Sequence, residues 1–140
     1  AHGLYPSVLT QHGLAAAIEA AADRSPTPIR LDIGTVGRLP AEREAAVYFC
    51  LLEALHNANK YGQASSIEIR LRRTGLDGVE PAVVFEVVDD GVGFDVGAAR
   101  DAGGQGLTNL ADRLGAVSGT LDIESSAGAG TIVRGTVPVT

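Results

Sequence analysis

The order of helix-like and strand-like segments is the feature that most restricts the fold of this chain. Some stretches have the spacing of apolar or Ala-rich helices, and others alternate like half-buried strands. Their order is helix, strand, helix, strand, strand, helix, strand, strand, which differs from the alternation of a doubly wound parallel sheet. We predict an α+β fold, a two-layer α/β sandwich in which a mixed sheet carries its helices on one face. The predicted segments are 12–24, 29–33, 40–61, 67–72, 82–88, 107–117, 121–124 and 131–139.

The length of the chain favours a single domain. It has 140 residues, of which 45% are hydrophobic, and this is enough to enclose a sizeable core. No apolar run reaches the roughly 18 residues that a membrane span needs. The chain contains no Met and begins at Ala1, so we expect it to be an excised piece of a longer protein. We predict one domain over residues 1–140, with an irregular lead-in over residues 1–10.

Charge and cysteine content exclude several classes of function. The net charge is -6, whereas a nucleic-acid-binding surface usually shows a basic stripe, so we expect no direct nucleic acid binding. Three Phe, three Tyr and no Trp make a base-stacking platform improbable. Cys50 is the only cysteine, which excludes an internal disulfide and a multi-cysteine metal site. Its apolar helical surroundings predict a buried, inert thiol, in keeping with a reducing cytoplasm.

A polar stripe runs along the longest predicted helix. Glu53, Asn57 and Lys60 follow one another at i, i+4 and i+7, opposite the apolar residues of that helix. A solvated face is one interpretation of this stripe. However, Asn57 and Asn59 lie mid-helix, where Asn is a poor choice, and a short amide kept there could be holding something. A carboxylate four residues before an amide oxygen could orient water and a hard cation such as Mg²⁺.

A second candidate site follows the apolar strand at 82–88. Asp89 lies at the end of this strand, where side chains line crevices, and Gly91 and Gly93 allow a tight backbone path close to a ligand. A carboxylate in this place could accept a hydrogen bond from an exocyclic amine. An ordinary Asp-Gly turn is the alternative interpretation.

Two further glycine clusters come later in the chain. Residues 103–106 precede the helix at 107–117, and exposed N–H groups at a helix N-terminus form a ready anion site. The spacing matches neither a dinucleotide fingerprint nor a P-loop, and a flexible loop is the alternative. Residues 128–131, Gly-Ala-Gly-Thr, are typical of a hairpin turn when taken alone.

The order and spacing of these segments resemble the gyrase, heat-shock chaperone, histidine kinase and mismatch-repair ATPases (the GHKL family, with the Bergerat fold). The resemblance covers about residues 44–139. The stretches similar to the N box, the two glycine boxes and the final Gly-Thr element are 53–61, 89–94, 104–107 and 128–131. Residues 4–9, followed by Gly13 and Leu14, resemble the segment that joins dimerisation helices to this domain. Residues 1–14 would then be a lead-in from dimerisation helices that the chain lacks.

The resemblance implies roles for the residues of the N box. Asn57 would hold Mg²⁺ together with the ATP phosphates. Glu53 would be the polar or general-base residue beside it, and the two would form the catalytic pair. Lys60 would reach a phosphate, and Tyr61 would border the nucleotide.

The resemblance also implies how the glycine boxes hold ATP. Asp89 would bind the adenine amine, and Thr131 would support it through water. Gly91 and Gly93 would let the chain pass the base. The residues that would cap the phosphates, at the end of a flexible lid over residues 94–103, are Gly104, Gly106 and Leu107.

The implied function is that of the ATP-binding catalytic domain of a sensor histidine kinase, of the branch that pairs with helix-turn-helix response regulators. It would transfer the γ-phosphate of ATP to a histidine on a separate dimerisation domain, because none of His2, His12 and His56 is a credible acceptor. Expected partners are that dimerisation domain and a cognate response regulator. We expect the fragment to be monomeric and the domain cytoplasmic, whether or not its parent is anchored in a membrane. An anti-sigma-factor serine kinase and a nucleotide-binding module without transfer activity are the alternatives.

Overall fold

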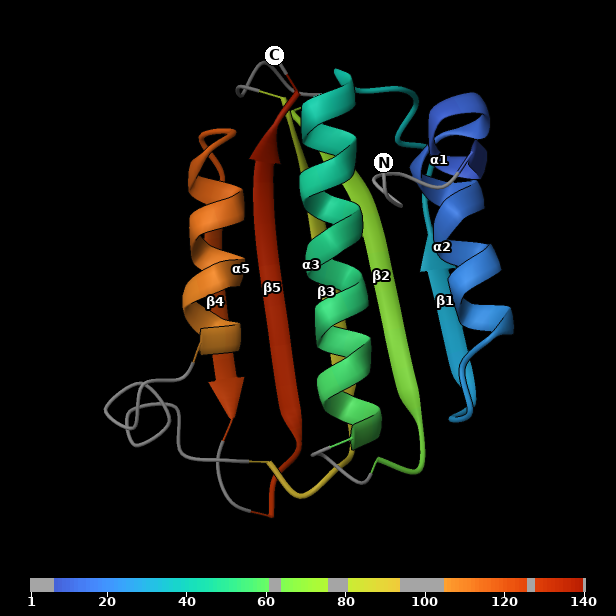
Figure 1. The fold of residues 1–140 in the computed structure, drawn as a ribbon, viewed down its shortest axis with the longest axis vertical. Helices are drawn as coiled ribbons and strands as arrows, with labels where there is room; N and C mark the ends of the chain where they lie inside the picture. Colours follow the sequence, from blue (N-terminus) through green and yellow to red (C-terminus); the bar gives the residue numbers. More distant parts are fainter. Residues whose placement is uncertain (1–6, 61–63, 76–80, 94–104, 126–127, 140) are drawn as a thin grey trace.

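The protein is described by a computed structural model that covers residues 7–60, 64–75, 81–93, 105–125 and 128–139. These residues form four helices packed against five strands (Figure 1). In chain order the elements are α1 (Ser7–His12), α2 (Leu14–Asp23), β1 (Ile29–Ile33), α3 (Ala41–Lys60), β2 (Ile67–Thr74), β3 (Ala82–Asp89), α5 (Gln105–Gly115), β4 (Thr120–Ser125) and β5 (Thr131–Pro138).

The strands form a single mixed sheet in the order β1-β2-β3-β5-β4. β1 and β2 are parallel, and every other neighbouring pair is antiparallel. The helices lie together on one face of this sheet, with α3 running along its middle and α5 in front of β4 (Figure 1). The predicted two-layer α/β sandwich, with a mixed sheet and helices on one face, is therefore confirmed. None of the helices in the described ranges is both long and apolar enough to cross a bilayer.

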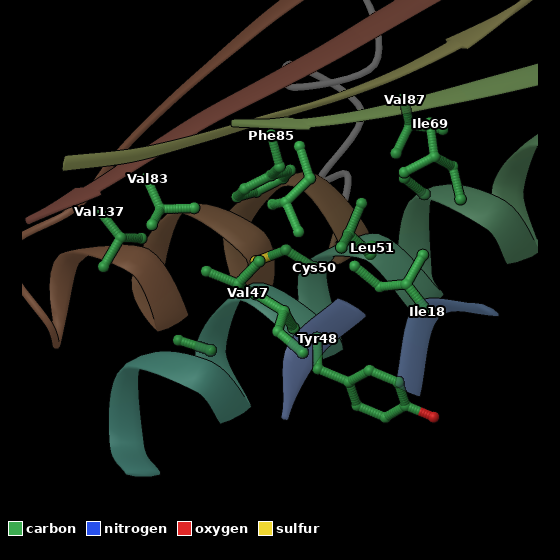
Figure 2. Close-up of a cluster of buried hydrophobic side chains, with 14 of the residues drawn as sticks. Ile18, Val47, Tyr48, Cys50, Leu51, Ile69, Val83, Phe85, Val87 and Val137 are labelled. Carbon is green, nitrogen blue, oxygen red and sulfur yellow. The ribbon is translucent and has the colours of Figure 1, made fainter. Parts of the chain in front are cut away.

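The core lies between α3 and the central strands. Side chains on a strand point alternately to opposite faces, and the alternate residues Val83, Phe85 and Val87 of β3 are 0–1% exposed on the helix side. Phe85 fills the middle of this layer, where it points toward α3 (Figure 2). Its partner on β5 is Gly135, at which a Cβ atom would lie 2.2 Å from the Phe85 ring. Gly135 thus leaves the space that the aromatic ring occupies.

Helix α3 carries one apolar face along its whole length. The carbonyl of Pro40 accepts the first backbone bonds of the helix, from the N–H groups of Arg43 and Glu44. Spacing of three and four residues places the apolar side chains on the side that packs against the sheet and α2. The buried side chains of this face include Tyr48, Leu51, Leu55 and Ala58, and Leu52 beside them is half-buried.

The N-terminal segment differs from the prediction. Residues 7–10 were expected to be irregular, but they belong to helix α1, which is six residues long. So short a helix is not stable on its own, and the burial of Leu9, only 2% exposed, holds it against the rest of the molecule. Gly13, with φ at +92°, then separates α1 from α2. A tertiary contact therefore decides the structure of this segment.

An arginine fork ties α1 to the start of α3. Arg38 donates from Nε and Nη2 to the carboxylate of Glu44, which is 2% exposed, and from Nη2 to the carbonyl of Thr10. The N–H of Leu39 donates to the same carboxylate. A Cβ atom at Gly13 would lie 2.9 Å from the Arg38 side chain, so glycine leaves room for the fork.

The face of the sheet without helices carries a network of charges. Glu86, whose side chain is 8% exposed, lies among three arginines on neighbouring strands. The closest contacts to its carboxylate are 2.7 Å from Arg134, 3.4 Å from Arg72 and 3.6 Å from Arg70. Asp122 extends the row to β4, 3.8 Å from Arg134. Burial raises the pKa of Glu86, but the hydrogen bond and charge of Arg134 and the charges of Arg70 and Arg72 together outweigh it, so the pKa is lowered.

Candidate functional site

Four elements have one end at the same edge of the molecule, and these ends carry or adjoin the candidate site residues. α3 and β3 end there, and α5 and β5 begin there (Figure 1). The strand register agrees, because Asp89 pairs with Ile67 at the start of β2 and with Thr131 at the start of β5. The predicted glycine-box and N-box segments, far apart in the sequence, therefore converge on one edge.

Asp89 is held at this edge by backbone amides. Its Oδ1 accepts a bond from the N–H of Gly91 at 2.8 Å, and the N–H of Thr131 also bonds to its carboxylate. The side chain is half-buried, and burial raises its pKa, an effect that the neighbouring charge of Asp90 increases and the two amides oppose. Alternation from Val87 places it on the helix side of the sheet. The result is a fixed acceptor at a partly dry edge, suited to a neutral donor such as an amine.

The turn before β5 is built closely around Asp89. Gly130 has φ at +75°, and a Cβ atom there would lie 2.3 Å from the carbonyl oxygen of Asp89. The Ser125 hydroxyl lies 2.8 Å from the Thr131 hydroxyl and donates to the carbonyl of Gly130 at 2.9 Å. Only glycine allows this approach without strain. The Gly-Ala-Gly-Thr stretch is therefore a turn, as the simpler interpretation held, and it also brings Thr131 to Asp89.

Asp90 was not predicted as a site residue, yet its side chain is tightly held. Its carboxylate accepts hydrogen bonds from the backbone and hydroxyl groups of both Ser65 and Ser66. These bonds, led by the one from the Ser65 hydroxyl, lower the pKa of Asp90 to about 2. Asp and Ser are common in side-chain-to-backbone turns, but this pairing joins residues 25 positions apart.

The polar stripe of α3 divides into residues with different surroundings. Glu53 is half-buried and borders a cavity of about 390 Å³ between α3 and α5. Asn57 is half-buried, and its side chain has no hydrogen-bond partner among the described residues. Lys60 is the last residue of α3, and Tyr61 lies outside the described residues. The other residues that border the cavity are Phe49, Leu110, Asp112 and Arg113.

The two mid-helix asparagines were predicted to be holding something, and for Asn59 the partner is the protein itself. Its Oδ1 accepts a bond from the Thr27 hydroxyl, and its Nδ2 donates to the Ser25 hydroxyl. Asn59 therefore fixes the connection between α2 and β1.

The N-terminus of α5 lies at the same edge of the molecule (Figure 1). This helix begins at Gln105, two residues before the predicted start, so Gly106 and Leu107 belong to its first turn. The first N–H groups of a helix have no intrahelical partner and attract anions. Gly104 and the predicted lid over residues 94–103 lie outside the described residues. Gly93, with φ at +69°, has the left-handed backbone that glycine favours.

Comparison with known families shows to which family the chain belongs. Residues 42–140 match the family model described as histidine kinase-, DNA gyrase B-, and HSP90-like ATPase. The chain belongs to this ATPase family. Membership implies a site for ATP, and the converging edge carries the segments that resemble the N box and the glycine boxes.

Two sequence relatives within this ATPase family are sensor kinases. The oxygen sensor histidine kinase NreB of Staphylococcus carnosus is 39% identical over 74% of this chain and 28% of its own length. A sensor-like histidine kinase of Chloroflexus aurantiacus is 36% identical over 97% of this chain and 24% of its own length. The chain thus spans about a quarter of the length of these curated relatives.

Solved structures support the fold of this ATPase domain. The histidine kinase domain of the Erythrobacter litoralis EL346 blue-light activated histidine kinase superposes with a TM-score of 0.64 and 23% identity, over 89% of this chain and 57% of that one. The histidine kinase AdeS of Acinetobacter baumannii gives 0.64 with 17% identity, over 91% of this chain and 61% of that one. At such identities the agreement concerns the fold alone.

Proposed function

We propose that this chain is the ATP-binding catalytic domain of a sensor histidine kinase, which presents the γ-phosphate of ATP to a histidine on a separate dimerisation domain. The observation that carries the proposal is the Asp89 carboxylate, which two backbone amides hold at the edge where α3 ends and α5 begins. The sensor histidine kinases among the relatives support this choice over a serine kinase of the same fold.

The adenine half of the proposed site lies at the ends of β3 and β5. Asp89 accepts a hydrogen bond from the exocyclic amine of adenine, and the Thr131 hydroxyl supports it through a water molecule. The backbone at Gly91 and Gly93 passes beside the base. The half-buried position of Asp89 favours this role, because a hydrogen bond to a charged acceptor is stronger where water is partly excluded.

The phosphate half of the proposed site lies at the end of α3 and the start of α5. Asn57, half-buried near the end of α3, supplies an amide oxygen as a ligand for Mg²⁺. Mg²⁺, held by Asn57, would neutralise negative charge on the phosphates of ATP. Glu53 lies one turn earlier on the same stripe, where it orients a water molecule or accepts a proton. The remaining proposed phosphate and nucleotide contacts are Lys60, Tyr61, Gly104, Gly106 and Leu107.

The chain's own part in phosphoryl transfer is to position ATP. In phosphoryl transfer most of the rate comes from alignment of the reacting groups and from charge stabilisation. The acceptor belongs to the dimerisation domain of the parent, and the phosphate then passes to a cognate response regulator of the helix-turn-helix type. We further propose that the domain works in the cytoplasm, is monomeric when isolated and binds no nucleic acid directly.

The test is a binding measurement with a non-hydrolysable ATP analogue, with and without Mg²⁺. Asp89→Asn should weaken binding at least about ten-fold, because a charged acceptor is replaced by a poorer one. Asp122→Asn, an exposed aspartate on β4, is the matched control and should leave affinity unchanged. Equal affinity of wild type and Asp89→Asn would rule out the adenine contact.

The transfer step needs the parent protein. Full-length protein incubated with labelled ATP should gain a phosphate that mild acid removes, which is the behaviour of phosphohistidine. A label that survives mild acid would point to serine phosphorylation instead. Protein that binds ATP and gains no label would be a nucleotide-binding module without transfer activity.

A further inference from the structure

Asp90 accepts more hydrogen bonds than the neighbouring Asp89, although it lies outside the proposed nucleotide contacts. Its Oδ1 accepts from the N–H groups of Ser65 at 2.8 Å and Ser66 at 3.0 Å. Its Oδ2 accepts from the hydroxyl groups of Ser65 at 2.5 Å and Ser66 at 3.3 Å. Both carboxylate oxygens are thus occupied by the chain itself. Asp90 therefore has little capacity left for a ligand.

The serine pair connects Asp90 to the end of α3. Ser65 and Ser66 come immediately before β2, and Ala64 before them donates its N–H to the carbonyl of Ala58 in α3. Asp90 therefore ties the strand end that carries Asp89 to the segment that follows α3. Through Ala64 this segment is bonded to the helix that carries Asn57.

The same contact fixes the path of the chain after β3. The register of β2 with β3 ends at the pair of Ile67 and Asp89, and the next backbone bond, from Asp90 N–H to the Ser66 carbonyl, is long at 3.4 Å. The side-chain bonds of Asp90 continue the ladder where the backbone ladder weakens. Gly91, the following residue, then directs its N–H to Asp89.

We propose that Asp90 is a positioning residue that, through Gly91, sets the direction of the Asp89 carboxylate and thereby the selectivity of the site for the adenine amino group. The proposal rests on the adenine role of Asp89 given above. Strand alternation places the Asp90 side chain on the face without helices, away from the base, so it acts through the backbone. A loss of the contact should change which base is preferred as well as how tightly nucleotides bind.

The measurement compares ATP with purine riboside triphosphate, which lacks only the amino group. In wild type the ratio of the two dissociation constants should be at least about ten, the worth of one hydrogen bond to a charged group. Asp90→Asn should lower this ratio about three-fold or more. The double variant Ser65→Ala, Ser66→Ala keeps the two N–H donors and should lower it by a smaller factor. Asp122→Asn is the control and should keep the wild-type ratio.

The outcomes separate this inference from the proposed function. A wild-type ratio near one, equal to that of Asp89→Asn, would remove the adenine role of Asp89 itself. A wild-type ratio of ten or so that Asp90→Asn leaves unchanged, while both nucleotides weaken equally, would overturn the positioning role and leave Asp90 merely structural. If Asp90→Asn does not fold, an unchanged ratio in the double serine variant would overturn the role in the same way.

Discussion

The two faces of the sheet bury their central side chains by different means. On the helix side, Phe85 is 0% exposed and packs into the space that Gly135 leaves open. On the other side, its neighbour Glu86 is 8% exposed, and three arginine side chains cover it in place of a helix. Dispersion and dehydration hold the first face, whereas charge holds the second. The contribution of the helix-covered face to stability should depend on how well its side chains pack. That of the face without helices, here called the open face, should depend on pH and salt.

The largest loss of stability is expected when the Phe85 side chain is removed from the helix-covered face. Phe85→Ala should lower the free energy of unfolding by about 3–5 kcal/mol, because the lost contacts leave a cavity that the packed helices cannot close. Urea unfolding followed by circular dichroism measures the change. Val84→Ala, on the half-buried open side of the same strand, is the matched control and should lose about 1 kcal/mol. Equal losses would contradict the contrast between the two faces.

A smaller loss of stability is expected when the negative charge of Glu86 is removed. Glu86→Gln removes the negative charge shared by Arg70, Arg72 and Arg134, and should lower the free energy of unfolding by about 1–2 kcal/mol at low salt. The arginines are 38–59% exposed, so solvent screens part of this interaction. Repeating the unfolding at about 0.5 M salt should reduce the difference. A difference that does not change with salt would assign the loss to packing instead.

Acid should weaken the face without helices through protonation of Glu86. The folded-state pKa of Glu86 is lowered, so its carboxylate stabilises the folded state above its unfolded pKa of 4.5, and this contribution is lost as the pH falls through the folded value. Unfolding measured from neutral pH down to about pH 3 should therefore show a smaller decline in Glu86→Gln than in wild type. The decline in Phe85→Ala should parallel that of wild type. Parallel declines in all three proteins would show that Glu86 does not contribute to the loss of stability in acid.

Most of the fold could be predicted because the strands alternate clearly. β2 and β3 follow their predicted ranges to within two residues, since one face is apolar and the other is charged or half-buried. The helix over residues 7–12 could not be predicted, because burial of Leu9 stabilises it and the sequence does not show what covers that residue. The early start of α5 at Gln105 falls within the usual uncertainty of helix ends.

The candidate site was predictable where its residues belong to compact motifs. Asp89 was expected from its own glycine-containing stretch and Thr131 from the family resemblance, and the strand register places them side by side. Asp90, Ser65 and Ser66 were missed because their hydrogen bonds span 24 or 25 positions. Nothing in either short stretch indicates its partner. Long-range polar pairing of this kind becomes visible only when strand register is known.

Cys50 is expected to have the least influence on stability among these positions, and its reactivity tests whether the helix-covered face is dry. This thiol is 0% exposed, and burial raises its pKa to about 12. At pH 8 roughly one thiol in ten thousand would be ionised, so alkylation of the folded protein should be very slow. Thr136→Cys in the background Cys50→Ala places a thiol on the half-buried open face as a matched probe and should react at least about a hundred-fold faster. Comparable rates would mean that water and reagent reach the layer between α3 and the sheet, and the contrast between the faces would then be one of charge alone.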